Sequence, residues 1–152
     1  MTKMVDDGRL DLSLITCEAG FRETGAEILM REPLVWAMCR GGTSPAKSPL
    51  PLSVWEESCA WRNAGISGLD AAGVDWRITF QSSNISGQRA AILADLAVAP
   101  IPKSCLKDDI IEVPDKFGLP KLPDYALGLI IGKTPTAAVE AAADHLRASF
   151  GS

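Results

Sequence analysis

The chain has 152 residues, with 15 Lys and Arg against 19 Asp and Glu, a net charge of −4 and 47% hydrophobic residues. This composition is typical of a globular protein and excludes collagen, coiled coil and intrinsic disorder. The basic residues are scattered, which argues against direct nucleic-acid binding, and no apolar run reaches the roughly 18 residues of a membrane span. Because the chain opens with polar residues rather than a secretion signal, we expect a cytoplasmic protein.

The first third of the chain predicts strands separated by a loop. Alternating apolar residues predict a strand at 10–16. Extended runs at 27–31 and 34–40 flank Pro33, which indicates a strand that is bent or broken at the proline. Residues 41–51 are rich in Gly, Ser and Pro and predict a loop that ends in a short helical turn.

The middle of the chain alternates between strand and helix signals. Cys59–Trp61 reads as a buried strand, followed by a helix that Asn63 caps and Gly73 ends. The pattern at 76–80 predicts a strand with one face in a core. Ser82, Ser83 and Asn84 then supply the side-chain acceptors that open a helix, whose apolar face is predicted to contain Ile85, Ile92, Leu93 and Leu96.

The last third completes this alternation. Residues 96–101 predict a buried strand that Pro102 ends, and 110–113 predict a further extended piece. After a linker, 125–131 predicts an apolar strand, and Thr134-Pro135 would start a final helix with Val139, Ala142, Leu146 and Phe150 in one stripe. Strands that alternate with helices predict α/β layers around a mainly parallel sheet.

The sequence gives little support for nucleotide binding or for cysteine and metal chemistry. The segment Gly128–Thr134 is similar to a phosphate-binding loop, but its spacing is one residue short and Pro135 removes a backbone donor, which favours an ordinary helix start. The four cysteines have no metal-binding spacing, and His145 falls on another helix face from Val139. The sequence therefore predicts no catalytic residue, no metal and no cofactor.

Binding fits the sequence better than catalysis. Trp61-Arg62-Asn63 and Ser82-Ser83-Asn84 each lie where a predicted strand gives way to a helix. Helix N-termini present backbone N–H groups and a positive dipole end, where small anions dock. The alternative is that these residues only cap two helices, and residue type alone does not separate the two interpretations.

Four segments together resemble the effector-binding (substrate-binding) domain of LysR-type transcriptional regulators. They are GRLDLSLIT, ILMREPLVWAMCRGG, the stretch from Pro49 to Ser104, and LPDYALGLII. This resemblance implies a type-2 periplasmic-binding-protein-like α/β fold, with 1–33 as a partial subdomain one, 34–124 as subdomain two, and 125–152 as the returning strand and helix of subdomain one. The winged helix-turn-helix and the opening strand and helix of the effector domain are not found, so the resemblance implies a fragment truncated at its N-terminus and unable to bind DNA alone.

Carried over position by position, the resemblance gives effector-facing sites and partners. The implied ligand-binding residues are Thr16, Cys17, Trp61, Arg62, Asn63, Ser82, Ser83, Asn84, Ile85 and Pro102. Asp95 stands where the family usually has a glycine, and Asp tolerates the left-handed conformation better than most residues. Arg62 and the helix N-termini favour an anionic effector, and Trp61 favours an aromatic one.

A truncated subdomain one would leave apolar positions partly uncovered, which predicts a homodimer. The positions expected to be partly uncovered are Leu12, Leu14, Leu129, Val139 and Leu146. Two alternatives stay open beside the regulatory fragment: a small nucleotide-binding protein or enzyme that uses Gly128–Thr134, and a truncated remnant without a function.

Overall fold

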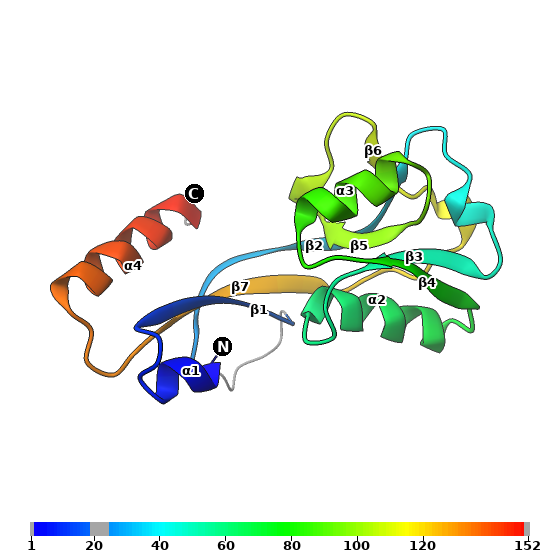
Figure 1. Cartoon of the computed structure of the whole chain (residues 1–152). Helices are drawn as coiled ribbons and strands as arrows, with labels where there is room; N and C mark the ends of the chain where they lie inside the picture. Colours follow the sequence, from blue (N-terminus) through cyan, green and yellow to red (C-terminus); the bar gives the residue numbers. More distant parts are fainter. Residues whose placement is uncertain (1, 19–24, 151–152) are drawn as a thin grey trace. The chain divides into compact units, whose positions relative to one another are not determined.

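Figure 1 shows the computed structural model, which describes residues 2–18 and 25–150. The chain divides into two compact units. Unit one contains residues 1–31 and 124–152, and unit two contains residues 32–123. Each unit is described by itself below. No helix among the described residues is long and apolar enough to cross a membrane.

Unit one is built on two long antiparallel strands. Its elements are α1 (Thr2–Asp6), β1 (Leu12–Glu18), the first residues of β2 (Glu27–Cys39), β7 (Asp124–Ile131) and α4 (Ala137–Phe150). β7 lies between β1 and β2, and its pairing with β1 runs from Leu12 opposite Ile131 to Glu18 opposite Tyr125. In α4 the side chains of Val139 and Ala143 are buried.

Two boundaries in unit one differ from the sequence prediction. β1 begins at Leu12 rather than Leu10, because the backbone N–H of Leu10 donates to the Met4 carbonyl at the end of α1 (3.0 Å). α4 begins after Thr136 rather than at Thr134-Pro135, since the Thr136 hydroxyl accepts from the Val139 N–H at 3.3 Å. Thr136 is therefore the residue that satisfies a backbone donor in the first turn.

Unit two places helices on both sides of its strands. Its elements are the remainder of β2, β3 (Leu50–Val54), α2 (Ala60–Ala71), β4 (Trp76–Gln81), α3 (Ile85–Leu93), β5 (Ala99–Pro102) and β6 (Ile110–Glu112). β2 pairs antiparallel with β5 and β6, and β3 pairs parallel with β4. In Figure 1, α2 and α3 lie on opposite sides of β3 and β5.

The prediction of a mainly parallel sheet is wrong for the strand pairs whose register the structure gives. Three of these pairs are antiparallel, and only β3 with β4 is parallel. The strand–helix–strand unit β3–α2–β4 does form a parallel pair, although the sequence prediction placed the first strand of this unit at Cys59–Trp61 rather than at β3. The other strands pair with partners far away in the sequence, which alternation does not specify.

Two prolines have unexpected places. β2 continues through Pro33 without a break, and its ladder with β5 begins one residue later, at Leu34 opposite Pro102. The segment predicted as a helical turn from Leu52 is strand β3, which contains Pro51. Pro51 has no backbone N–H to donate, but its carbonyl accepts a hydrogen bond from the Val98 N–H at 3.0 Å. The proline is therefore tolerated at this position of the strand.

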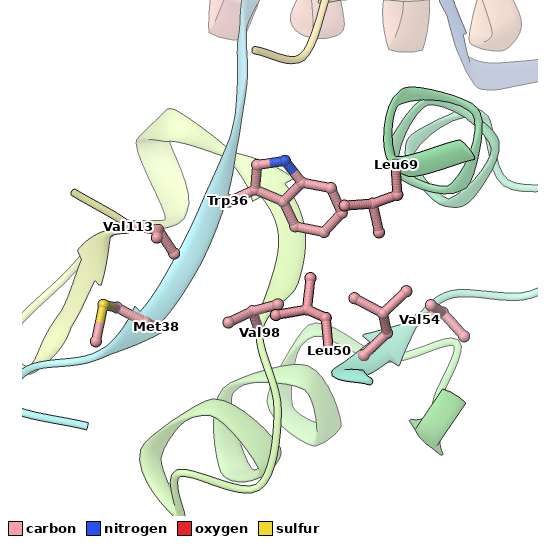
Figure 2. Packing of buried hydrophobic residues seen from close by; sticks show 8 residues of the cluster. Trp36, Met38, Leu50, Val54, Leu69, Val98 and Val113 are labelled. Carbon is pink, nitrogen blue, oxygen red and sulfur yellow. The ribbon is translucent and has the colours of Figure 1, made fainter. Parts of the chain in front are cut away.

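Two hydrophobic clusters form the core of unit two. The first surrounds Trp36 and joins β2, β3 and α2 through Leu50, Leu52 and Leu69 (Figure 2). The second contains Trp55, Ile92 and Ile101 among its members and lies where α3 covers β5. In contrast to the predicted apolar face, Leu93 and Leu96 are 45% and 44% exposed. The buried positions of α3 are Gln88, Ala91 and Ile92, and Leu96 lies beyond the end of the helix.

Asp95 fastens the loop at 41–46 to the turn after α3. Its φ is 52°, so it adopts the left-handed conformation that the sequence predicts. Its carboxylate accepts from the Thr43 N–H (2.8 Å), the Thr43 hydroxyl (2.9 Å) and the Ser44 N–H (3.0 Å). Burial raises the pKa of Asp95, but the hydrogen bonds from Thr43 and Ser44 outweigh burial and bring it to about 2.

We expect Asp95→Asn, which keeps the left-handed backbone accessible, to lower the free energy of unfolding at neutral pH by about 1–2 kcal/mol. A pKa lowered by folding stabilises the protein above the ordinary value of 3.8, and this contribution is lost as pH falls through about 2. Urea unfolding of both proteins at several pH values measures the difference. An equal difference at neutral pH and at the lowest pH would show that charge has no part.

Candidate functional site

The predicted ligand-binding residues fall in both units. Thr16 and Cys17 belong to unit one, and the other eight belong to unit two. Thr16 and Cys17 lie within β1, opposite Leu127 and Ala126, because β1 continues to Glu18 beyond the predicted end of the strand at residue 16. Cys17 is 8% exposed and its Sγ lies 3.7 Å from the Ala126 carbonyl oxygen. Burial raises the pKa of the Cys17 thiol, so this group stays neutral.

The predicted strand at Cys59–Trp61 is the start of α2 instead. Cys59 is the extended residue before the helix, and its carbonyl accepts from the Asn63 N–H at 3.1 Å. Trp61, Arg62 and Asn63 therefore occupy the first turn, and Asn63 does not cap the helix. The helix ends as predicted, with Gly73 in the left-handed conformation just after Ala72.

Arg62 is held by acceptors from the ends of two strands. Its Nη1 donates to the Trp55 carbonyl, directly after β3, at 2.9 Å and to Oε1 of Gln81, the last residue of β4, at 3.1 Å. The guanidinium is planar, so two bonds to one nitrogen fix the direction in which the other donors point. Within 2–18 and 25–150 the structure gives Nε and Nη2 of Arg62 no protein acceptor.

The tryptophan next to Arg62 in the sequence and the tryptophan whose carbonyl Arg62 binds contact each other. The rings of Trp55 and Trp61 meet edge to face with centroids 4.8 Å apart. Trp55 is 8% exposed and donates its indole N–H to the Pro100 carbonyl at 3.2 Å. Trp61 is half-buried and packs on the second hydrophobic cluster.

The turn Ser82–Asn84 opens α3 as the sequence predicts. Oδ1 of Asn84 accepts from the Ser86 N–H at 2.8 Å, and Oγ of Ser82 accepts from the Asn84 N–H at 3.1 Å. Ser83 and Asn84 are exposed and Ile85 is half-buried against the second cluster. Because Gln81 precedes this turn and contacts Arg62, the starts of α2 and α3 are linked through one side chain.

Pro102 ends β5 opposite Leu34 and is buried. The segment that follows it is fixed by Glu32, whose carboxylate accepts from the Ser104 N–H and hydroxyl, both at 2.9 Å. The neighbouring Cys105 carries a raised thiol pKa, first because of burial and then because of Glu32. A neutral thiol is a poor nucleophile, which argues against cysteine chemistry here.

Three residues of this region were missed by sequence reasoning. Gln81, Gln88 and Glu32 supply acceptors or donors to backbone and side chains around the predicted site. Their partners lie far away in the sequence, so no local spacing pattern identifies them. The one available signal was the polarity of Gln88, which lies on the helix face between Ile85 and Ile92, one turn away on either side.

The phosphate-loop alternative does not survive the geometry. Gly128 lies within β7, opposite Ile15, and is buried. The backbone of residues 128–131 is part of the β1–β7 ladder, so it cannot wrap a phosphate. Among the described residues there is also no group of three or more His, Cys, Asp and Glu side chains that could hold a metal ion.

Comparison with known proteins gives a consistent result. The sequence model of the family described as LysR substrate binding domain matches residues 1–151. The HTH-type transcriptional regulator PecT of Dickeya dadantii (strain 3937) is 28% identical over 125 residues, which are 82% of this chain and 39% of that protein. The chain spans half or less of the length of the curated relatives that it matches.

Solved structures show the same fold. The regulatory domain of a HypT mutant from Salmonella typhimurium has a TM-score of 0.75 at 14% identity, covering 99% of this chain and 79% of that chain. The CcmR regulatory domain of Synechocystis PCC6803, solved in complex with 2-PG, has a TM-score of 0.66 at 16% identity, covering 97% of this chain and 77% of that chain. This likeness shows the periplasmic-binding-protein-like α/β fold.

Proposed function

We propose, from the premise that this chain belongs to the family of LysR substrate-binding domains, that it is the small-molecule effector-binding part of a transcriptional regulator. Its family and relatives are regulators rather than enzymes. We further propose that unit two is the complete second subdomain predicted at 34–124, and that unit one is the partial first subdomain. DNA binding would belong to a winged helix-turn-helix outside these residues.

The observation that carries the proposal is the fixed guanidinium of Arg62. Acceptors at the ends of β3 and β4 bind Nη1 of Arg62. The orientation of the other donors, Nε and Nη2, is therefore fixed by the fold. Arg donors in such a fork bind carboxylate or phosphate with two parallel hydrogen bonds. The capped start of α3, which follows Gln81, adds the positive end of a helix dipole.

We propose an anionic effector that carries an aromatic or other apolar group. Arg62 and Ser82–Asn84 would bind the anion, and Trp61 would contact the apolar group. Asn63, Ile85 and Pro102 of unit two, and Thr16 and Cys17 of unit one, stay predicted contacts. The CcmR regulatory domain was solved with 2-PG, which supports a small molecule as the kind of partner to test.

We expect Arg62→Gln to weaken the binding of an aromatic carboxylate about 10- to 100-fold, because a hydrogen bond to a charged group contributes about 1.5–3 kcal/mol. Titration calorimetry with benzoate, salicylate, glycolate and inorganic phosphate measures the affinities, after a thermal-shift screen of the same compounds. Arg77→Gln is the matched control, because Arg77 is exposed on β4. It should bind as the wild type does.

Two results would contradict the proposal at different levels. If no small anion in a broadened panel raises the melting temperature of the wild-type protein, the effector-binding role fails. If an anion binds and Arg62→Gln binds it equally well, the role of Arg62 fails while effector binding stands.

We also propose a homodimer in the cytoplasm. The sequence prediction is wrong for two of its five positions, since Leu129 and Val139 are only 1% and 8% exposed. Leu12, Leu14 and Leu146 are half-buried, so these three are partly uncovered as predicted. Further support comes from β1, which pairs only with β7 among the described strands and so presents an open sheet edge.

A further inference from the structure

We infer that Gln88 is a positioning residue that fixes the effector-facing turn Ser82–Asn84 to the end of β3. This inference rests on the proposed function, because the turn matters only if an effector contacts it. Gln88 lies in α3, one turn after the helix begins, and its side chain is 0% exposed. A buried amide is retained in a core only where all its hydrogen-bonding atoms find partners.

Both N–H donors and the acceptor oxygen of the Gln88 amide have hydrogen-bond partners in unit two. Its Oε1 accepts from the hydroxyl of Ser53, which is itself 0% exposed in β3. Its Nε2 donates to the Val54 carbonyl at 2.7 Å and to the Ser82 carbonyl at 2.8 Å. One side chain therefore ties the last residues of β3 to the residue that opens the turn before α3.

These bonds continue directly to the residues proposed to face the effector. The Ser82 N–H donates to the same Val54 carbonyl at 3.1 Å, and the Ser82 hydroxyl accepts from the Asn84 N–H at 3.1 Å. The next carbonyl along the chain, that of Trp55 directly after β3, is the acceptor that holds Arg62. A displacement at Gln88 would therefore move both the turn and the support of the guanidinium.

Gly87 shows how closely this turn is packed. A Cβ at Gly87 would overlap Oγ of Ser82 and lie 2.8 Å from its Cβ. The side chain of Ser82 therefore occupies the space that any larger residue at 87 would need. The amide of Gln88 fixes the turn through a hydrogen bond to the Ser82 carbonyl, and the missing side chain at Gly87 leaves room for the Ser82 side chain.

The test compares Gln88→Met with Leu50→Ala. Methionine keeps the length of glutamine but makes none of its hydrogen bonds, and Leu50 is a buried residue at the start of β3 that belongs to the first hydrophobic cluster. Both variants should lower the melting temperature. Only Gln88→Met should shift the backbone amide NMR signals of Ser82, Asn84 and Ser86 in the free protein, and only it should weaken benzoate binding, by about 10-fold.

The outcomes separate the two proposals. If Gln88→Met melts earlier yet leaves these amide signals and the benzoate affinity as they are in Leu50→Ala, Gln88 is structural only and the inference is wrong. If wild-type protein binds none of the anions, the proposed function fails, and the amide signals still decide whether Gln88 holds the turn. Should Gln88→Met not fold, Ser53→Ala removes one bond of the same amide and must shift the same signals.

Discussion

Replacing Leu69 with alanine should lower the free energy of unfolding by about 2–5 kcal/mol, as expected for a leucine truncated in a core that cannot collapse around the cavity. Leu69 is 0% exposed, and Figure 2 shows its side chain directed at the ring of Trp36. The helix that carries Leu69 also carries Arg62 in its first turn. Urea unfolding followed by circular dichroism measures the loss.

Leu93→Ala is the matched control, because it deletes the same atoms from a helix residue that is 45% exposed. We expect its effect to stay within about 0.5 kcal/mol. Equal losses for the two variants would mean that the core of unit two is not packed around Leu69 as described.

Alanine substitutions at two glycines of α2 should have opposite signs, although they lie one turn apart in the same helix. A Cβ at Gly65 would lie 2.9 Å from Cγ of Pro100 and 3.1 Å from the Trp36 ring, and neither ring can move aside freely. Overpacking of this kind costs about 1–3 kcal/mol. This cost exceeds the roughly 1 kcal/mol by which alanine favours a helix over glycine, so Gly65→Ala should destabilise the protein.

Gly68 meets no such obstacle, since its nearest contact would be Cδ2 of Leu122 at 3.5 Å, an ordinary van der Waals distance. Gly68→Ala should therefore stabilise the protein by about 0.5–1 kcal/mol. The urea-unfolding midpoints of Gly65→Ala and Gly68→Ala, each compared with that of the wild type, test this prediction. A stabilising Gly65→Ala would show that α2 does not approach β5 as closely as the structure has it.

The elements that local chemistry specifies could be predicted from the sequence. Asn84 caps α3 and Gly73 follows α2 in the left-handed conformation, because each satisfies a backbone requirement within a few residues. Asp95 was expected to adopt a left-handed conformation and does. Its second role, as the acceptor for three donors of the 41–46 loop, depends on residues about fifty positions away and has no local signal.

The errors have a common physical origin. A loop and a helical turn were predicted across β3 because residues 41–51 are rich in Gly, Ser and Pro. In the structure Pro51 lies in β3, which pairs parallel with β4, and its carbonyl accepts from the Val98 N–H. Cys59–Trp61 was read as a strand because a short apolar run has no decisive period. This segment starts helix α2 instead, and Cys59 and Trp61 pack on the second hydrophobic cluster.

The sequence by itself determined the family resemblance, most element positions and the turn that opens α3, since these depend on neighbouring residues and on the apolar pattern. Tertiary structure alone decided which strands pair, that Arg62 is held by the ends of β3 and β4, and that Gln88 is buried and fully bonded. The reason is that hydrogen bonds between distant segments form only after the chain has brought them together. A polar residue such as Gln88 has a definite role only within that surrounding.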